Sequence, residues 1–431
     1  MIFYKIKEKF SKKKGTVPFF RTVSFFIPFF SPLFYSAEGL SKLCFFLYHE
    51  RNLREIVDGG RGKKRMSFLD SSFFKKYLLP GFIFQSVVIA GGYGTGRELV
   101  EFFLNHGPLG GLLGMLFVTT IIWSITLAVT FEFSRQFLAY DYRTFFMKLL
   151  GPFWFIFEII YFILLFLVLA VIGSAAGALI RNNFNIPYPV GVIIMLAVIG
   201  FLTFKGSGLI EKFLSSWSIL LYFVYGALLV AVLLKFGPEI QKNFSSAVVH
   251  PKWALGGFQY ALYNMGIIPA VLFCIKHIET RKEAVTAGLL GGLIGIIPGL
   301  LFFIAVVSHY PAVLPVEVPA DYILQQLGFP ALRIFYLVVL FGTLIETGTG
   351  FIHAVNERIN SALQTKGKAL PRWQRPLVAS VLLLIGLGMS TFGLIALIKK
   401  GYGNISWGFF IVYIIPLMTL GIYKMIKTRR A

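Results

Sequence analysis

The stretch that decides the fold is LLPGFIFQSVVIAGGYGTGRELVEFFLN, residues 78–105. It begins as an apolar membrane span. Glycines then interrupt the apolar run, and charges follow directly: Gly91, Gly92, Gly94, Gly96, Arg97, Glu98 and Glu101. Charges and non-helical backbone at mid-membrane depth are costly, and proteins retain them where they face protein or a cavity. We therefore expect a binding site here rather than a simple membrane anchor.

The composition is that of a membrane protein with many spans. The chain has 431 residues, of which 57% are hydrophobic and 14% are charged, whereas soluble domains carry roughly 25% charged residues. Basic cytoplasmic loops account for a net charge of +22, so we expect a lipid bilayer and no nucleic acid as partner. With only Cys44 and Cys274, the chain has neither a disulfide framework nor a cysteine-rich metal site.

The first 65 residues differ from the rest in being basic and rich in aromatic residues. They are a signal peptide, a basic cytoplasmic tail, or translated upstream sequence that is not native protein. The third interpretation is favoured because GGRGKKR (residues 59–65) can be written in purine codons, like a ribosome-binding site, and Met66 follows it. We therefore expect the native protein to start at Met66 and residues 66–431 to form one transmembrane domain.

From Met66 onward, apolar runs of about 20 residues predict about ten membrane-spanning helices. They lie near 76–105, 108–134, 153–180, 189–204, 213–236, 257–276, 284–307, 331–358, 376–398 and 404–426. Most Lys and Arg residues outside the spans fall on the side of Lys75 and Lys76, which predicts that both termini are cytoplasmic. We predict that two connecting segments form either short helices or ordinary loops: ADYILQQLG at 320–328 and residues 136–150.

The spans fall into two similar halves, 76–236 and 257–427. Each half opens with an interrupted span, the first around Gly92–Gly96 and the second around Asn264–Gly266. The spans that follow start alike, as GPLGGLLGMLF and GLLGGLIGIIPG. Five spans per half enter the membrane in opposite directions, and inverted repeats that open with broken helices are typical of secondary transporters. The sequence thus predicts an all-α, 5+5 inverted repeat with helices 1 and 6 broken.

The two breaks are the predicted site for a solute. Free N–H groups at the start of a half-helix attract anions such as a carboxylate, and glycine lets a ligand approach the backbone. We therefore expect substrate contacts from Gly92, Tyr93, Gly94, Thr95, Gly96, Asn264 and Gly266. Arg97 either joins this site or forms an i,i+4 ion pair with Glu101, and Glu98 or Glu101 is an alternative proton or cation site.

A second candidate region is LFGTLIETGTGFIH, in the eighth predicted span. Glu346 lies there among hydroxyl residues that include Thr347 and Thr349, with His353 two turns further on. This group either binds Na⁺, relays protons from Glu346 to His353, or packs small residues around one buried pair. We interpret two other carboxylates, Glu132 and Glu158, as groups near the membrane interface, with Glu132 paired with Arg135.

The segment FFKKYLLPGFIFQSVVIAGGYGTGRELVEFF, residues 73–103, resembles the opening of YkvI-type bacterial membrane proteins, which are similar to the amino acid–polyamine–organocation transporters. This resemblance implies a LeuT-like fold with substrate at the breaks of spans one and six. It also implies Na⁺ between span one and the hydroxyls of Thr347 and Thr349. Many relatives lack an Arg–Glu pair directly after the break, so Arg97 and Glu98 set this chain apart.

The expected function is that of a permease in the bacterial cell membrane. It would move an amino acid or a small carboxylate-bearing solute by alternating access, coupled to Na⁺ or H⁺, with no other cofactor. The alternatives are a membrane receptor of the same fold that binds without transport, and a channel. No enzyme motif is present, because GGYGTG lies in a membrane span without a preceding strand.

Overall fold

The computed structural model describes residues 71–430, with gaps at 90–91, 206, 365–370 and 372. The predicted extension, residues 1–65, lies outside the described residues. The described residues form helices joined by short connections, with no strand among them. Six of the described helical stretches are long and apolar enough to cross a membrane: Pro108–Phe137, Tyr142–Phe184, Phe223–Ser245, Arg281–Val307, Pro330–His353 and Leu394–Thr428. Two shorter apolar helices accompany them: Tyr188–Thr203 and Gln374–Ser390. The protein is therefore an all-helical, multi-pass membrane protein.

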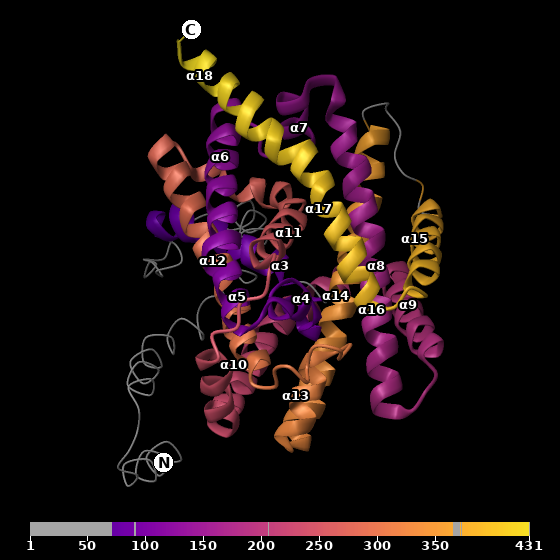
Figure 1. The fold of residues 1–431 in the computed structure, drawn as a ribbon. Coiled ribbons are helices and arrows are strands. Elements are labelled where there is room, and N and C mark those ends of the chain that lie inside the picture. The colour runs from indigo at the N-terminus through magenta and orange to yellow at the C-terminus, as the bar shows by residue number, and fades with distance from the viewer. Residues whose placement is uncertain (1–70, 90–91, 206, 365–370, 372, 431) are drawn as a thin grey trace, which may run out of the picture.

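The α-helices follow one another as labelled in Figure 1. The first nine are α3 (Leu79–Val88), α4 (Arg97–Phe102), α5 (Pro108–Leu113), α6 (Thr120–Phe137), α7 (Tyr142–Leu150), α8 (Phe155–Phe184), α9 (Tyr188–Lys205), α10 (Ser207–Ser245) and α11 (Trp253–Met265). The rest are α12 (Arg281–Val307), α13 (Pro319–Leu327), α14 (Pro330–Gln364), α15 (Gln374–Ser390), α16 (Leu394–Ala396), α17 (Gly403–Phe409) and α18 (Ile422–Arg430). Three short segments matter below: the 3-10 helices η3 (Tyr93–Thr95) and η7 (Ile268–His277), and the π-helical η8 (Leu397–Tyr402).

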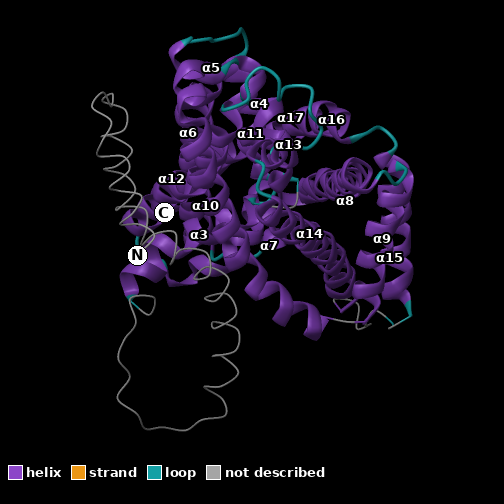
Figure 2. Cartoon of the chain, turned by 90° about the horizontal axis from the view of Figure 1, so that it is seen from below, coloured by secondary structure: helices purple, strands orange, loops and turns teal. Residues whose placement is uncertain are grey.

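The helices form two groups with the site between them. One group contains α3, α6, α10 and α12, and the other contains α8, α9, α14 and α15, as Figures 1 and 2 show from perpendicular directions. The short helix α4 contacts α11 in the space between the groups, and α11 packs against α17. Residues from both ends of the sequence therefore meet at the centre of the bundle.

Helix α12 packs closely against two neighbours because it carries two stripes of glycine, an arrangement that lets membrane helices approach each other. Gly288 and Gly292 face α6, where a Cβ atom on Gly292 would overlap Ser124. On the adjacent face, the Cα of Gly291 would lie 3.0 Å from a Cβ atom on Gly81 of α3. The glycines of GLLGGLIG thus bring α3, α6 and α12 into direct contact.

A proline in α12 supplies a further link to α3. Pro298 has no N–H group, so the carbonyl of Ile294, one turn earlier, loses its partner within the helix. The amide of Gln85 in α3 donates to that carbonyl over 2.8 Å, and Gln85 is itself buried. The first span is therefore attached to α12 through a backbone group that Pro298 releases.

Both connecting segments form short helices rather than ordinary loops, and one predicted boundary is wrong. The segment 136–150 contains α7, whose first turn is capped by the Asp141 carboxylate accepting from the N–H of Thr144 over 2.9 Å. The ADYILQQLG segment forms α13, which ends at Gly328 with φ +70°. The ninth predicted span, 376–398, ends early at Ser390, because Gly393 with φ +79° turns the chain before a new helix begins.

The link between Gln85 and α12 can be tested by a double-mutant cycle. Replacing Gln85 with Leu leaves the partly buried Ile294 carbonyl unpaired, which should cost about 1–3 kcal/mol of stability. Thermal unfolding of the purified protein in detergent measures the loss. In a Pro298→Ala background the helix regains the missing N–H, so the same substitution should cost clearly less. Equal losses in both backgrounds would contradict this account.

Alanine substitutions at two helical glycines should have different effects on thermal stability. Gly292→Ala should lower the thermal midpoint, because a Cβ atom there overlaps α6, and such overpacking costs about 1–3 kcal/mol. Gly350→Ala in α14 meets nothing within 4 Å and should leave the midpoint unchanged or raise it. If both variants melt at the same temperature, close packing at Gly292 is not what holds α12 against α6.

Candidate functional site

The first span is broken where the sequence predicts it. Helix α3 ends at Val88 and α4 begins at Arg97, with the single 3-10 turn of η3 between them. Gly96 has φ +76°, a left-handed conformation that residues with side chains seldom adopt. The chain therefore changes direction inside the bundle instead of continuing as one helix.

Hydroxyl groups satisfy the backbone at this break. The Thr95 hydroxyl donates to the carbonyl of Gly92 over 2.7 Å and accepts from the N–H of Arg97 over 3.1 Å. The Tyr336 hydroxyl of α14 donates to the carbonyl of Gly94 over 2.7 Å. A Cβ atom on Gly94 would lie 2.7 Å from the hydroxyl oxygen of Tyr225, so glycine lets this side chain approach the break. The carbonyls of Gly92 and Gly94 and the N–H group of Arg97 are thus satisfied by the protein itself.

The second break follows α11, as predicted. The α-helix ends at Met265, and the tighter η7 begins at Ile268. A Cβ atom on Gly266 would overlap the ring of Phe409 in α17, so the glycine permits a close approach between these elements. Asn264 is buried, and its amide donates to the carbonyl of Tyr260 over 2.9 Å.

A cavity lies between the two breaks and has a volume of about 30 Å³. The first broken span contributes Val87, Val88, Gly92 and Glu98, and the second contributes Tyr263, Asn264 and Ile267. The remaining wall comes from Leu164, Val168, Phe351 and Tyr402 on α8, α14 and η8. By volume it holds about two water molecules, so the site is small in this structure.

One carboxylate dominates this cavity. Glu98 is 4% exposed, and the hydroxyl of Tyr263 donates to its Oε2 atom. The Tyr263 ring stacks on Tyr402 at 4.7 Å between ring centroids and on Phe102 at 5.7 Å. On the other side a Cβ atom at Gly92 would lie 2.6 Å from Glu98 Oε1, so the glycine leaves room for the carboxylate.

Arg97, the neighbour of Glu98, points elsewhere. Its guanidinium pairs with Glu101 over 2.6 Å, the i,i+4 ion pair that the spacing predicts as one alternative. It also donates to the carbonyls of Leu314 and Val316, at 2.6 and 3.0 Å, in the connection before α13. Arg97 does not line the cavity. The side chain attaches the second half of the broken span to that connection.

The predicted ion-coupling residues of α14 occupy different faces of the helix. Tyr336 contacts the first break and Phe351 lines the cavity, so these two define the face toward the site. At 100° per residue, Thr347 shares this face, whereas Thr349 lies about 200° from Thr347 and Glu346 about 100° from it. Thr347 is therefore the coupling candidate placed on the side of the cavity, while Glu346 is half-buried on another face.

The two other carboxylates are held by arginine. Glu132 forms a two-point ion pair with Arg135 at 2.8 and 2.9 Å, which confirms the predicted pairing. Glu158 accepts from the hydroxyl of Tyr142 over 2.8 Å and lies 3.9 Å from Arg358. The Arg358 guanidinium is also 3.9 Å from the centroid of the Tyr142 ring. These groups stabilise contacts between helices away from the cavity.

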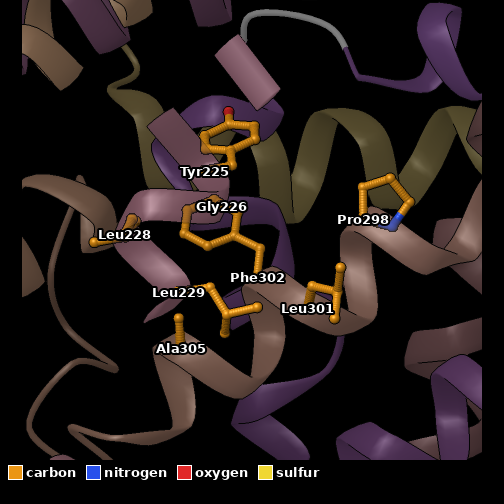
Figure 3. Close-up of a pocket in the computed structure, with 8 residues that line it drawn as sticks. All are labelled: Tyr225, Gly226, Leu228, Leu229, Pro298, Leu301, Phe302 and Ala305. Atoms are coloured by element: carbon orange, nitrogen blue, oxygen red, sulfur yellow. The ribbon is translucent and has the colours of Figure 1, made fainter. Parts of the chain in front are cut away.

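A second, smaller cavity of about 20 Å³ lies between α10 and α12 (Figure 3). Apart from Tyr225 its walls are apolar, and the Tyr225 hydroxyl points away from the aliphatic side chains in the view. The Tyr225 ring stacks on Phe302 at 5.3 Å. With no charged group, this cavity lacks the chemistry to orient a polar solute.

The sequence pattern alone does not single out four of the cavity residues. Leu164, Val168 and Phe351 look like ordinary apolar positions in long helices, and Tyr402 follows the Lys399–Lys400 pair in a stretch read as a boundary between spans. No local signal identifies them, because their role depends on which helices pack around the breaks.

Fold and site together define a multi-pass helical membrane protein with a small cavity at two helix breaks, mostly apolar but containing one buried carboxylate. No protein-family model matches the chain. It is similar to YkvI of Bacillus subtilis, described as an uncharacterized membrane protein, with 24% identity over 294 residues that cover 67% of this chain and 82% of YkvI. The predicted resemblance to YkvI-type proteins is thereby confirmed.

Solved structures with a broadly similar course of the chain include two transporters. A manganese transporter of Eremococcus coleocola shares 14% identity, with a TM-score of 0.47 and coverage of 84% of this chain and 81% of that one. A Na⁺-coupled sialic acid symporter shares 13% identity, with a TM-score of 0.40 and coverage of 78% and 80%.

The position of Arg97 yields a stability prediction. Arg97→Ala leaves the buried carboxylate of Glu101 without its close partner, which should cost about 3–5 kcal/mol. Lys399 is 4.0 Å from Glu101 but largely exposed, so it compensates little. Removing both charges, as Arg97→Ala with Glu101→Ala, should be less damaging than Arg97→Ala alone. Thermal unfolding of the three variants measures this, and a double variant that melts lower than Arg97→Ala would refute it.

Proposed function

We propose that the protein is a secondary transporter that moves a small organic solute by alternating access, coupled to Na⁺ or H⁺. The observation that carries this proposal is the cavity between the two breaks, with the buried Glu98 carboxylate and the Tyr263 hydroxyl in its wall. A buried charge inside a membrane bundle is costly to keep and marks a pathway or a site for a solute or ion.

The arrangement of the short helices supports the predicted inverted repeat of 76–236 and 257–427. Helix α7 lies between the second and third spans of the first half, and α13 has the same place in the second half. Helix α13 contacts η3 at the first break, while α7 contacts η7 at the second break. Each connecting helix therefore covers the break of the other half, as two oppositely oriented copies would require.

The long helices also pack across the two halves, the fifth span of each half against the third span of the other. In the first half the fifth span, α10, packs against α14, the third span of the second half. In return η8, at the start of the second half's fifth span, packs against α8, the third span of the first half. This reciprocal packing supports ten spans in a LeuT-like arrangement, with broken helices one and six at the centre.

Two groups are candidates for coupling to an ion. Glu98 binds a proton or a cation in the cavity, and Thr347 offers a hydroxyl on the face of α14 that meets the first break. Glu101, Glu346 and Thr349 point away from the cavity or are engaged by neighbours, so they are weaker candidates. With Lys75 and Lys76 on the cytoplasmic side, both termini lie in the cytoplasm and the protein resides in the bacterial cell membrane.

The experiment is solute flux into proteoliposomes that contain the full chain. A mixture of radiolabelled amino acids, organic acids and amines should include at least one solute that exchanges faster than in empty liposomes, in a Na⁺- or pH-dependent manner. Gly92→Ala should reduce this flux about tenfold or more, because its Cβ atom would lie 2.6 Å from Glu98 Oε1.

The control is Gly388→Ala in α15, which meets nothing within 4 Å and should keep normal flux. A solute that binds in a thermal-shift assay but never crosses the membrane would indicate a receptor of the same fold instead. Flux unaffected by Gly92→Ala would place the pathway outside this cavity.

A further inference from the structure

We propose that the corner between α7 and α8 binds a phospholipid of net negative charge. Three cations and three apolar side chains form this corner, which we call the α7 surface: Arg143, Lys148, Lys427, Met147, Phe153 and Trp154. None of these residues lines the cavity between the two breaks. The proposal therefore does not depend on whether that cavity transports a solute.

Helix α7 turns two of the cations away from the bundle. The buried face of the helix consists of Phe145, Phe146 and Leu149. At 100° per residue, Arg143 and Lys148 each lie about 110° from the middle of that face, one on either side. Lys148 is exposed and Arg143 is half-buried. Both charges are therefore within reach of a partner outside the protein.

An aromatic ring already orients the guanidinium of Arg143. Its Cζ atom lies 5.1 Å from the centroid of the Trp154 ring in η6 (Gly151–Trp154), the 3-10 turn between α7 and α8. A ring that covers one face of a guanidinium leaves the N–H groups at the edge free. Those groups donate in pairs to the oxygens of a phosphate. The stacked arginine therefore fits the phosphate of a lipid headgroup.

Helix α18 brings the third cation to the same place. The Lys424 Nζ atom donates to the carbonyls of Lys148 and Leu149 over 2.7 and 3.1 Å, which holds α18 against the end of α7. Lys427 is exposed and lies three residues further along α18. Figure 1 shows α7 and the end of α18 at the same end of the bundle. The sequence of α18, IYKMIKTRR, contains no carboxylate that could offset these charges.

The nearby carboxylates leave the α7 surface positive. Glu158 lies 3.9 Å from Arg358, and Asp141 caps the first turn of α7, at the end of the helix far from Lys148. Among the described residues, none forms an ion pair with the three cations of the surface or accepts a hydrogen bond from their side chains. This excess of positive charge favours an anionic partner.

Exposed apolar side chains beside the cations favour a lipid over a soluble anion. Phe153 is 60% exposed and Met147 is 48% exposed. Both belong to the helical stretch Tyr142–Phe184, which is long and apolar enough to cross a membrane. Aromatic and basic residues at the end of such a span lie at the depth of the lipid headgroups. The acyl chains would lie along Phe153 and Met147 while the phosphate meets Arg143 and Lys148.

The test is a lipid titration of the purified full chain in dodecyl maltoside, followed by thermal unfolding. Dioleoylphosphatidylglycerol is anionic, whereas dioleoylphosphatidylcholine has the same chains and a phosphate but no net charge. The anionic lipid should raise the midpoint in a saturable manner, at an about tenfold lower concentration. Equal effects of the two lipids would overturn the proposal, as would an equal effect of glycerophosphoglycerol, the soluble headgroup without chains.

Variants separate the α7 surface from a general effect of charge. Arg143→Gln with Lys148→Gln should raise the half-saturating concentration of the anionic lipid about tenfold or more and leave that of the neutral lipid unchanged. The matched control is Arg281→Gln with Lys282→Gln, which removes an exposed arginine and an exposed lysine from the start of α12. An equal loss of preference in the control would overturn the proposal.

A second pair covers the case in which the first double variant does not fold. Lys148→Gln with Lys427→Gln changes two exposed side chains that have no ion pair with any described residue, so the fold should persist. This pair should also weaken binding of the anionic lipid severalfold. Unaltered preference for the anionic lipid in a folded variant of either pair would refute a role for the α7 surface.

Discussion

Backbone groups that a helix break exposes inside a membrane must find partners within the protein, and the rest of this structure depends on that constraint. The carbonyl of Gly94 is satisfied by the hydroxyl of Tyr336 in α14. In α12, Pro298 releases the carbonyl of Ile294, and Gln85 of the first span takes it up. These hydrogen bonds attach the first span to both helix groups. The same breaks that create a site therefore also determine which helices surround it.

Two neighbouring charged residues after the first break have different roles. Arg97 and Glu98 are consecutive in α4, so their side chains leave the helix about 100° apart. Arg97 meets Glu101 and the connection before α13, which holds the broken span in place. Glu98 meets Tyr263 and the cavity. One residue is a structural attachment, and the next supplies the charge on which the proposed function rests.

Glycine has two distinct uses in this chain. In α12, glycines such as Gly292 let helices pack in contact, which brings the first span and α6 together. At the breaks, Gly92 and Gly96 serve the site instead, the first by leaving room for Glu98 and the second by adopting φ +76°. The interrupted span and the GLLGGLIG stripe are both readable from sequence, but their partners are not.

The sequence by itself determined the membrane class and the positions of both breaks, because hydropathy and glycine act within a few residues of chain. It left the segments that form α7 and α13 as short helices or loops. It left the role of Arg97 as a choice between a solute contact and an ion pair. The tertiary structure placed its guanidinium with Glu101 and also brought Phe351 and Tyr402 to the cavity wall. These outcomes depend on how distant helices cross, which local patterns do not encode.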